Sequence, residues 1–257
     1  MITERVKIEE AKEPDLNKLE KGARILREGG LVAFPTETVY GLGANALDEQ
    51  AAKKIYAAKG RPSDNPLIAH IADFHQVDTL VKEIPKEGRR LMEAFWPGPL
   101  TLIFDKSEIV PYGTTGGLDT VAVRMPRDPI ARALIRLAGV PVAAPSANVS
   151  GRPSPTTADH VWQDMNGKID MIIDGGPVGI GVESTIIDVS GDEPMILRPG
   201  AVTQEMASEV LGRKIGLDPA ITGTGPVRGD MRPKAPGMKY RHYAPKASLT
   251  LVEGQME

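Results

Sequence analysis

The stretch Leu-Val-Ala-Phe-Pro-Thr-Glu-Thr-Val-Tyr-Gly-Leu-Gly (31–43) joins a short apolar run to a segment rich in hydroxyl-bearing and small residues. Residues 31–34 are continuously apolar, as is typical of a strand buried on both faces. The segment after them carries threonines, a glutamate and glycines at the carboxyl end of the strand, where open α/β sheets bind their ligands. This stretch therefore predicts an α/β fold with a binding site beside residues 35–43.

The patterns around this stretch mix helices and strands without strict alternation. We expect helices over 16–26, 48–59, 77–81, 87–95, 130–137 and 203–211, and one that Thr156 or Thr157 caps and that ends at Met165. We expect strands over 31–34, 67–71, 100–104, 121–125, 140–144, 171–174, 185–189 and 195–197. Neighbouring strands near 100–125 and 171–197 indicate antiparallel pairing. The predicted fold class is therefore α/β, with an open, twisted mixed β-sheet flanked by helices.

The composition is that of an ordinary globular chain of 257 residues, 41% hydrophobic and 25% charged. The absence of cysteine excludes disulfides, thiolate zinc sites and a thiol nucleophile, and it fits a cytoplasmic protein. Residues 1–14 are charged and lack the apolar core of a signal peptide. No apolar run approaches the ~20 residues of a membrane-spanning helix, so we expect no membrane partner.

Charge is unevenly distributed along the chain. The formal net charge is −3, but residues 226–246 hold six Lys or Arg and one Asp, which puts +5 on this segment and −8 on the rest. A basic segment on an acidic body indicates an anionic partner, or a solvated linker that lies on that body. Residues 212–246 are also rich in Gly and Pro, so we expect a linker or lid there. A further strand is predicted at 248–252.

Two cations at the end of the second predicted helix are the first candidates for binding chemistry. Lys59 and Arg61 flank a glycine and precede Pro62. An Arg can hold phosphate oxygens in pairs and a Lys supplies a compact charge, so residues 59–64 are suited to a polyphosphate. The alternative is that both side chains complement the helix dipole at a solvated surface.

Other polar residues lie within strands or at their ends. Arg124 belongs to an otherwise apolar strand, and a buried Arg needs an anion, which is either an internal carboxylate or that of a substrate. Ser146 and Asn148 follow a buried strand, in a segment of small residues that can expose its backbone to a phosphate or a base. His70, at a strand end, is a candidate for hydrogen bonding to a substrate rather than for binding a metal.

Several common motifs are absent or do not fit. Residues 41–46 match G-x-G-x-x-A, but no helix is predicted there, and the basic Arg61 occupies the position expected for a ribose-binding acid. The chain contains no G-x-x-x-x-G-K-[ST], G-x-S-x-G or H-E-x-x-H. Ordinary P-loop chemistry and a nucleophilic serine are therefore not expected.

Seven linked motifs occur in one order between about residues 15 and 245. They are Phe-Pro-Thr-Glu-Thr-Val-Tyr-Gly-Leu-Gly (34–43), Lys-Gly-Arg-Pro (59–62) with Asn-Pro-Leu (65–67), Trp-Pro-Gly-Pro-Leu-Thr (96–101), Val-Arg-Met-Pro (123–126), Ala-Pro-Ser-Ala-Asn (144–148), Glu-Ser-Thr-Ile (183–186) and Leu-Arg-Pro-Gly (197–200). Together they resemble the YrdC-like threonylcarbamoyl-AMP synthases, and residues 235–245 resemble the linker of the two-domain branch of this family. The set is far more specific than any one motif.

This resemblance implies a fold and a reaction. The fold is an open α/β twisted sheet around a concave, cationic cavity, which agrees with the mixed sheet predicted above. The reaction converts L-threonine, bicarbonate and ATP into L-threonylcarbamoyl-AMP and pyrophosphate, and Mg²⁺ shares the charge of the triphosphate. The product feeds a downstream tRNA threonylcarbamoyl transferase machinery that makes N6-threonylcarbamoyladenosine. Direct binding of tRNA to this chain is left open.

The resemblance also implies roles for individual residues. Lys59 and Arg61 are the catalytic pair because they hold the triphosphate, and no acid–base residue is clearly demanded. The residues implied in ATP binding are Lys59, Arg61, Ser63, Thr120, Ser146, Asn148, Arg198, Tyr240 and His242. Those implied around threonine are Thr36, His70, Arg124, Ala144 and Ser184, with Arg124 on the carboxylate. No direct protein ligand of a metal is predicted.

By the same resemblance, the chain has three parts. Residues 1–211 are the YrdC-like catalytic domain, 212–246 are the basic linker, and 247–257 begin a C-terminal domain that is mostly lacking, as in a truncated chain. Tyr240, Arg241 and His242 in the linker are expected to form a lid over the site, which retains a hydrolysable intermediate.

Two other functions compete with this one. A nucleic-acid-binding module without catalysis would place RNA in a cationic hollow, but a net charge of −3 and 4% aromatics argue against it. A carbamoyl-transfer domain of the same fold would share the nucleotide motifs. It would not need to keep Thr36, Arg124 and Ser184, all of which are present here.

Overall fold

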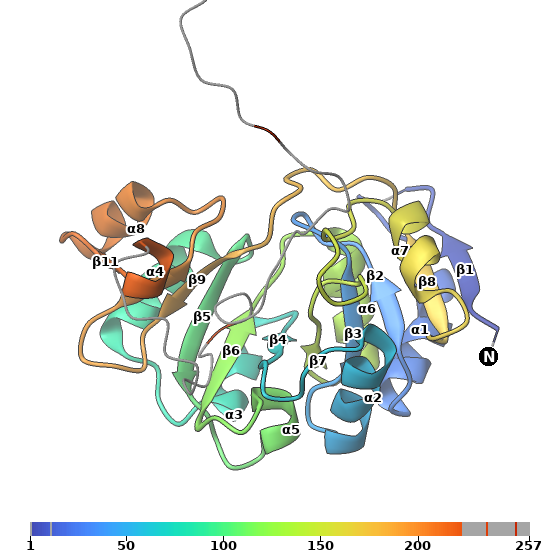
Figure 1. Cartoon of the computed structure of the whole chain (residues 1–257), viewed down its shortest axis with the longest axis horizontal. Coiled ribbons are helices and arrows are strands. Elements are labelled where there is room, and N and C mark those ends of the chain that lie inside the picture. The colour runs from blue at the N-terminus through green and yellow to red at the C-terminus, as the bar shows by residue number, and fades with distance from the viewer. Residues whose placement is uncertain (1, 11, 223–234, 236–249, 251–257) are drawn as a thin grey trace, which may run out of the picture.

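Figure 1 shows the computed structural model of the chain, which describes residues 2–10, 12–222, 235 and 250. In this part of the chain, eleven strands form one sheet in the order β1-β8-β2-β3-β7-β4-β6-β5-β9-β10-β11. The strands are β1 (Glu4–Lys7), β2 (Val32–Phe34), β3 (Gly41–Asn45), β4 (Ile68–His70), β5 (Leu100–Asp105), β6 (Thr120–Arg124), β7 (Val142–Ala143), β8 (Met171–Asp174), β9 (Thr185–Asp188), β10 (Met195–Arg198) and β11 (Gly216–Leu217).

The sheet contains both parallel and antiparallel pairs of strands, so the predicted mixed sheet is confirmed. β5 pairs antiparallel with β6, and β9 with β10, as expected for these regions. At the other end of the sheet, β8 pairs in parallel with both β1 and β2. β4 is parallel to β6, with His70 in register with Arg124. This register places two predicted site residues side by side at the carboxyl ends of two inner strands.

The seven helices predicted from the sequence are all present, with boundaries within two residues. The helices are α1 (Leu16–Arg27), α2 (Glu49–Lys59), α3 (Val77–Leu80), α4 (Lys86–Phe95), α5 (Tyr112–Thr115), α6 (Pro129–Ala138), α7 (Ala158–Met165), α8 (Gln204–Leu211), α9 (Pro219–Thr222) and the short 3₁₀ helix η1 (Phe74–Gln76). None of the described helices combines the length and apolar character needed to cross a bilayer.

Helix α2 shows how local chemistry sets the start and end of an element. The side chain of Asp48 accepts hydrogen bonds from the backbone N–H groups of Gln50 and Ala51, as an N-cap residue does. Gly60 follows the helix at φ 61°, in the left-handed conformation that favours glycine. This turn separates Lys59, in the last turn of the helix, from Arg61 just beyond it.

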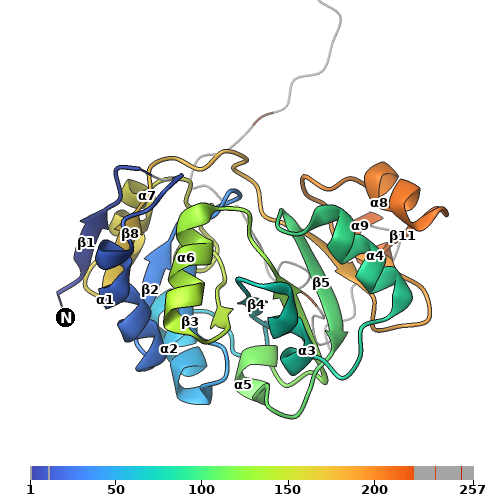
Figure 2. The same ribbon diagram turned by 180° about the vertical axis from the view of Figure 1, so that it is seen from behind.

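Helices cover both faces of the β8–β2–β3 half of the sheet (Figures 1 and 2). Leu19 of α1 and Leu134 of α6 pack in one cluster with Val32, while Ile55 of α2 packs in another cluster with Ala33. Successive strand residues point to opposite faces, so both clusters use the same strand. The prediction that residues 31–34 are buried on both faces is confirmed.

One central strand, which contains two glycines, was not predicted from the sequence. Residues 41–45 form β3, which pairs antiparallel with β2, rather than part of a loop. A Cβ atom on Gly43 would lie 2.8 Å from the ring of Phe34 and 2.9 Å from Val142, so this close approach needs a glycine. The sequence analysis also missed β1, whose residues are partly buried and exposed in turn. Within the predicted linker, β11 and α9 form over 216–222, and the strand predicted at 248–252 lies outside the described residues except for Thr250.

Candidate active site

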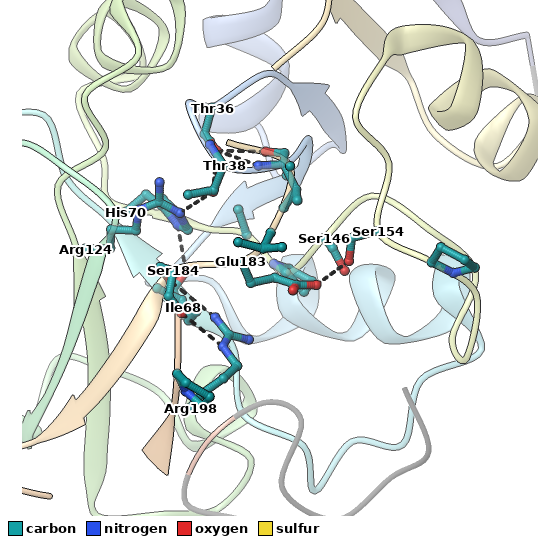
Figure 3. Close-up of a pocket in the computed structure, with 18 of the residues that line it drawn as sticks. Thr36, Thr38, Ile68, His70, Arg124, Ser146, Ser154, Glu183, Ser184 and Arg198 are labelled. Carbon is teal, nitrogen blue, oxygen red and sulfur yellow. Dashed lines mark hydrogen bonds between the residues drawn. The ribbon is translucent and has the colours of Figure 1, made fainter. Parts of the chain in front are cut away.

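The ends of several strands surround a cavity of about 560 Å³ (Figure 3). Its walls come from the segment after β2, from β4 and β6, from the segment after β7, and from the residues around β9 and β10. The predicted site residues that line it are Thr36, Arg61, His70, Arg124, Ala144, Ser146, Ser184 and Arg198. The fold thus brings residues from widely separated motifs into one cavity.

The guanidinium of Arg124 is held from three sides. Its Nε donates to the carbonyl oxygen of Gly98 (3.3 Å), Nη1 to Oγ1 of Thr38 (2.9 Å) and Nη2 to Oε1 of Glu37 (2.7 Å). The internal carboxylate considered from the sequence is therefore present, although Arg124 also faces the cavity. A guanidinium has five N–H groups. Two N–H groups of Arg124 remain after these contacts with described residues. A carboxylate that binds a guanidinium with both oxygens accepts two such hydrogen bonds.

His70 lies beside Arg124 because the two parallel strands place them in register. Its Nδ1 lies 3.1 Å from the carbonyl oxygen of Ile68, to which it can only donate. Burial, together with the charge of Arg124, lowers the pKa of His70 to about 3. The ring is therefore neutral at neutral pH, and it suits hydrogen bonding rather than attraction of an anion.

Arg198 reaches the cavity from the end of β10. Its Nε donates to the backbone oxygen of Ser184 (3.0 Å), and Nη2 donates to the Ser184 hydroxyl (3.2 Å). That hydroxyl also lies 2.7 Å from Oγ1 of Thr101. Burial lowers the pKa of Arg198 to about 10, which still leaves a cation at neutral pH.

The two cations at the end of α2 point to different places. Arg61 lines the cavity, and its side chain donates to the backbone oxygens of Asn65 and Pro66. Lys59 is 2% exposed, and its Nζ donates to the backbone oxygens of Ser146 and Asn148, the latter at 2.6 Å. Lys59 is not among the residues that line the cavity. It braces the segment that carries Ser146 instead.

The remaining predicted ATP-binding residues that the structure describes do not line the cavity. Asn148 lies behind Ser146, accepts a 2.5 Å hydrogen bond from its hydroxyl, and uses its amide nitrogen on backbone oxygens. Ser63 is exposed in the turn after α2, and Thr120 begins β6, at the opposite end from Arg124. Neither lines the cavity. Tyr240 and His242 lie outside the described residues.

Four polar residues of the described chain, Glu37, Thr38, Ser154 and Glu183, line or brace this cavity and were not singled out from the sequence. Glu37 and Thr38 hold Arg124, and the Ser154 hydroxyl donates to the Glu183 carboxylate across the cavity wall. Glu37, Thr38 and Glu183 lie within quoted motifs, so the signal was present. Which of the polar residues in a motif faces the ligand depends on strand geometry, which the sequence alone does not provide.

The fold and the cavity define an open α/β protein that can hold two anionic groups close together, since three guanidinium groups of the described residues line one pocket. A family model described as "Telomere recombination", for the Sua5, YciO and YrdC proteins, matches residues 24–200. A second model, described as "Threonylcarbamoyl-AMP synthase, C-terminal domain", matches residues 202–257. The chain belongs to the Sua5/YciO/YrdC family, which confirms the resemblance found in the sequence.

Individual relatives agree with this assignment. The chain is 59% identical over 237 residues to a threonylcarbamoyl-AMP synthase of Pyrococcus abyssi, and the match covers 92% of this chain and 68% of that protein. It is 53% identical over 241 residues to the Bacillus subtilis enzyme of the same name, covering 93% and 68%. The crystal structure of P. abyssi Sua5 complexed with L-threonine matches with a TM-score of 0.89 and 56% identity, over 96% of this chain and 70% of that one.

Proposed function

We propose that this chain condenses L-threonine, bicarbonate and ATP into L-threonylcarbamoyl-AMP, with release of pyrophosphate. The activity of a threonylcarbamoyl-AMP synthase follows from the family and from the high identity to enzymes of that name. The chain is thus a nucleotidyltransferase of tRNA modification. The structural observation that supports the substrate assignment is that residues implied around threonine and residues implied around ATP line the same cavity.

Threonine is proposed to bind at the Arg124 side of the cavity. The two N–H groups of Arg124 that have no partner among the described residues hold the substrate carboxylate in pairs. Thr36, the neutral His70 and Ser184 surround the amine and the side chain, and Ala144 supplies a small wall. The complex of P. abyssi Sua5 with L-threonine supports this substrate.

The triphosphate of ATP is proposed to bind between Arg61 and Arg198, with Ser146 at the nucleotide. Lys59 lies behind this site and keeps the segment 146–148 in place through its hydrogen bonds. Of the predicted catalytic pair, Arg61 lines the cavity and is proposed to act on the phosphates, whereas a catalytic role of Lys59 stays a prediction. The contacts of Ser63, Thr120, Asn148, Tyr240 and His242 with ATP stay predictions.

A divalent cation fits this site only as a partner of the phosphates. The part of the chain that the structure describes contains no group of three or more His, Asp or Glu side chains arranged around a metal. Glu183 offers one carboxylate in the cavity. Mg²⁺ in nucleotide sites is commonly held by one or two carboxylates, phosphate oxygens and water. Glu183 is therefore the proposed protein contact of Mg²⁺, which would offset phosphate charge.

The chemistry requires anionic reactants to meet in a confined space. The threonine ammonium and bicarbonate form a carbamate, with loss of one water and one proton. A carbamate oxygen then attacks the α-phosphorus, and pyrophosphate leaves. Guanidinium groups fixed by backbone and hydroxyl oxygens offset these charges and align the reactants, which is the main contribution of the protein.

Pyrophosphate release tests this proposal directly. Release from ATP is measured with and without L-threonine and bicarbonate. We expect it to depend on both, and release that ignores threonine would reject the assignment. The same assay separates the competing hypotheses, because an RNA-binding module releases no pyrophosphate and a carbamoyl-transfer domain for another acceptor does not require threonine. The cytoplasmic location and the downstream transferase machinery stay predictions.

A further inference from the structure

The arginines that line the cavity differ in their partners. The hydrogen bonds of Arg61 and Arg198 described above go to backbone and hydroxyl oxygens. Arg124 forms an ion pair with Glu37, whose Oε1 lies 2.7 Å from Nη2, and the two side chains are 4% and 14% exposed. An ion pair this well shielded from water both cancels charge and fixes geometry.

Glu37 is itself anchored to the backbone. Its second oxygen, Oε2, accepts hydrogen bonds from the backbone N–H groups of Arg127 (3.1 Å) and Asp128 (3.4 Å), just before α6. Burial raises the pKa of Glu37, but the charge and hydrogen bond of Arg124 and the backbone donors outweigh it, so the pKa lies below its usual value. The carboxylate is therefore ionised and cannot rotate away without losing donors on both sides.

Thr38 supplies a second fixed contact. It is fully buried, and its Oγ1 accepts from Nη1 of Arg124 at 2.9 Å. The same hydroxyl lies 2.9 Å from Oγ1 of Thr36, which lines the cavity. Figure 3 shows Arg124, Thr38 and Thr36 following one another along one wall. The direction of the guanidinium is thus set by two neighbouring residues of one segment.

Glu37 offsets the charge of Arg124 on this side of the cavity. Arg124 and Glu37 together carry no net charge, which matches a zwitterionic amino acid. An unpaired guanidinium in the same cavity would attract the far more highly charged ATP. Resting on the proposed function, we infer that Glu37 is a positioning and specificity residue, which aims Arg124 at the amino-acid carboxylate and keeps phosphate away from it.

The test compares Glu37→Ala with the wild-type protein in equilibrium binding of L-threonine, L-threoninamide, ATP and inorganic phosphate. We expect the affinity for L-threonine to fall at least about tenfold, as for other buried charge pairs that lose one partner. The preference for L-threonine over L-threoninamide, which lacks the carboxylate, should fall with it. ATP affinity should stay within about twofold, since the contacts of Arg61 and Arg198 are intact. Inorganic phosphate should compete with threonine in the variant and not in the wild type.

A double-mutant comparison separates positioning from a general structural effect. If Glu37 acts through Arg124, adding Glu37→Ala to Arg124→Ala causes no further loss of threonine affinity. Additive losses, or equal losses for threonine and ATP, would overturn the inference. Glu108→Ala, at an exposed glutamate, is the matched control and should leave all four affinities unchanged.

Two further arms keep the test decisive. If Glu37→Ala does not fold, as judged by circular dichroism, Thr38→Val removes the hydrogen bond between Arg124 and the Thr38 hydroxyl at nearly constant volume. It should weaken threonine and spare ATP, and an unchanged threonine affinity would count against the inference. The wild-type protein could release pyrophosphate only with threonine while the Glu37→Ala variant keeps normal threonine affinity. That pair of results would reject the inference and leave the proposed function standing.

Discussion

Lys59 is buried at the end of α2, with its ammonium directed at the backbone oxygens of Ser146 and Asn148. Lys59→Met keeps most of the side-chain volume but leaves these carbonyl groups without their donor. We expect the free energy of unfolding to fall by about 2–4 kcal/mol, measured by urea denaturation. Lys168→Met is the control, since the exposed Lys168 donates to one carbonyl oxygen, that of Asp164. Equal losses in the two variants would contradict a bracing role for Lys59.

Asp128 gives a pH-dependent prediction. Its side chain caps α6 by accepting from the backbone N–H of Ala131 (2.9 Å). Burial raises the pKa of Asp128 from 3.8 to about 6; the cap hydrogen bond opposes this rise, and the nearby charge of Glu37 adds to it. Between these two values the folded protein binds more protons than the unfolded chain, so this group lowers stability as pH rises from 4 to 7.

Asp128→Asn should remove this penalty and keep the cap, because asparagine is an equally good N-cap residue. We expect the variant to be more stable than wild type at pH 7, by up to about 3 kcal/mol for a pKa rise of about two. The difference should shrink towards zero near pH 4, in denaturation curves recorded across this range. A stability gain that is constant with pH would show that the charge of Asp128 is not its cause.

At the scale of elements, the contact between the segments around β9 and β10 is so close that it requires a glycine. A Cβ atom on Gly200, just after β10, would lie 2.6 Å from the backbone nitrogen of Thr185 and 2.7 Å from the backbone oxygen of Glu183. Gly200→Ala should therefore push β9 away, cost about 1–3 kcal/mol of stability and raise the KM for threonine through the displaced Ser184.

Gly139, which ends α6 at φ 68°, offers the matched control. Nothing lies within 4 Å of a Cβ atom there, so Gly139→Ala strains only its own backbone. It should cost about 1 kcal/mol and leave both KM values unchanged. Denaturation and steady-state kinetics on the two variants check this contrast. An unchanged KM for threonine in Gly200→Ala would show that the β9–β10 contact does not position the site.

The same scale explains what the sequence could predict. Helices such as α2 and α6 can be predicted from apolar periodicity, an Asp N-cap and a terminal glycine. All three signals lie within the helix or next to it in the sequence. β3 was not predicted because its glycines do not follow a strand pattern. They allow a close approach to Phe34 that exists only in the folded sheet. Likewise, motif resemblance identified Arg124, but not its pairing with Glu37, because that contact depends on how two distant segments meet.

At the scale of the whole molecule, the cavity lies where the two halves of the sheet meet. Thr36 follows β2, which belongs to the half covered by α1 and α6, whereas Ser184 and Arg198 adjoin β9 and β10 of the other half. A ligand that contacts both sides therefore ties together parts of the sheet that lie several strands apart. Binding should then be visible as increased stability of the entire domain.

Thermal unfolding measures this coupling. At a concentration of ~100 times its Kd, each ligand should add about 2.7 kcal/mol of stability, if it binds only the folded state. For a domain of this size, that corresponds to a rise in Tm of roughly 5–10 °C. Arg124→Ala should lose the rise caused by threonine and keep the rise caused by ATP, because ATP is proposed to bind through Arg61 and Arg198 instead. A variant that lost both shifts would show that Arg124 supports the cavity as a whole rather than the amino-acid side of it.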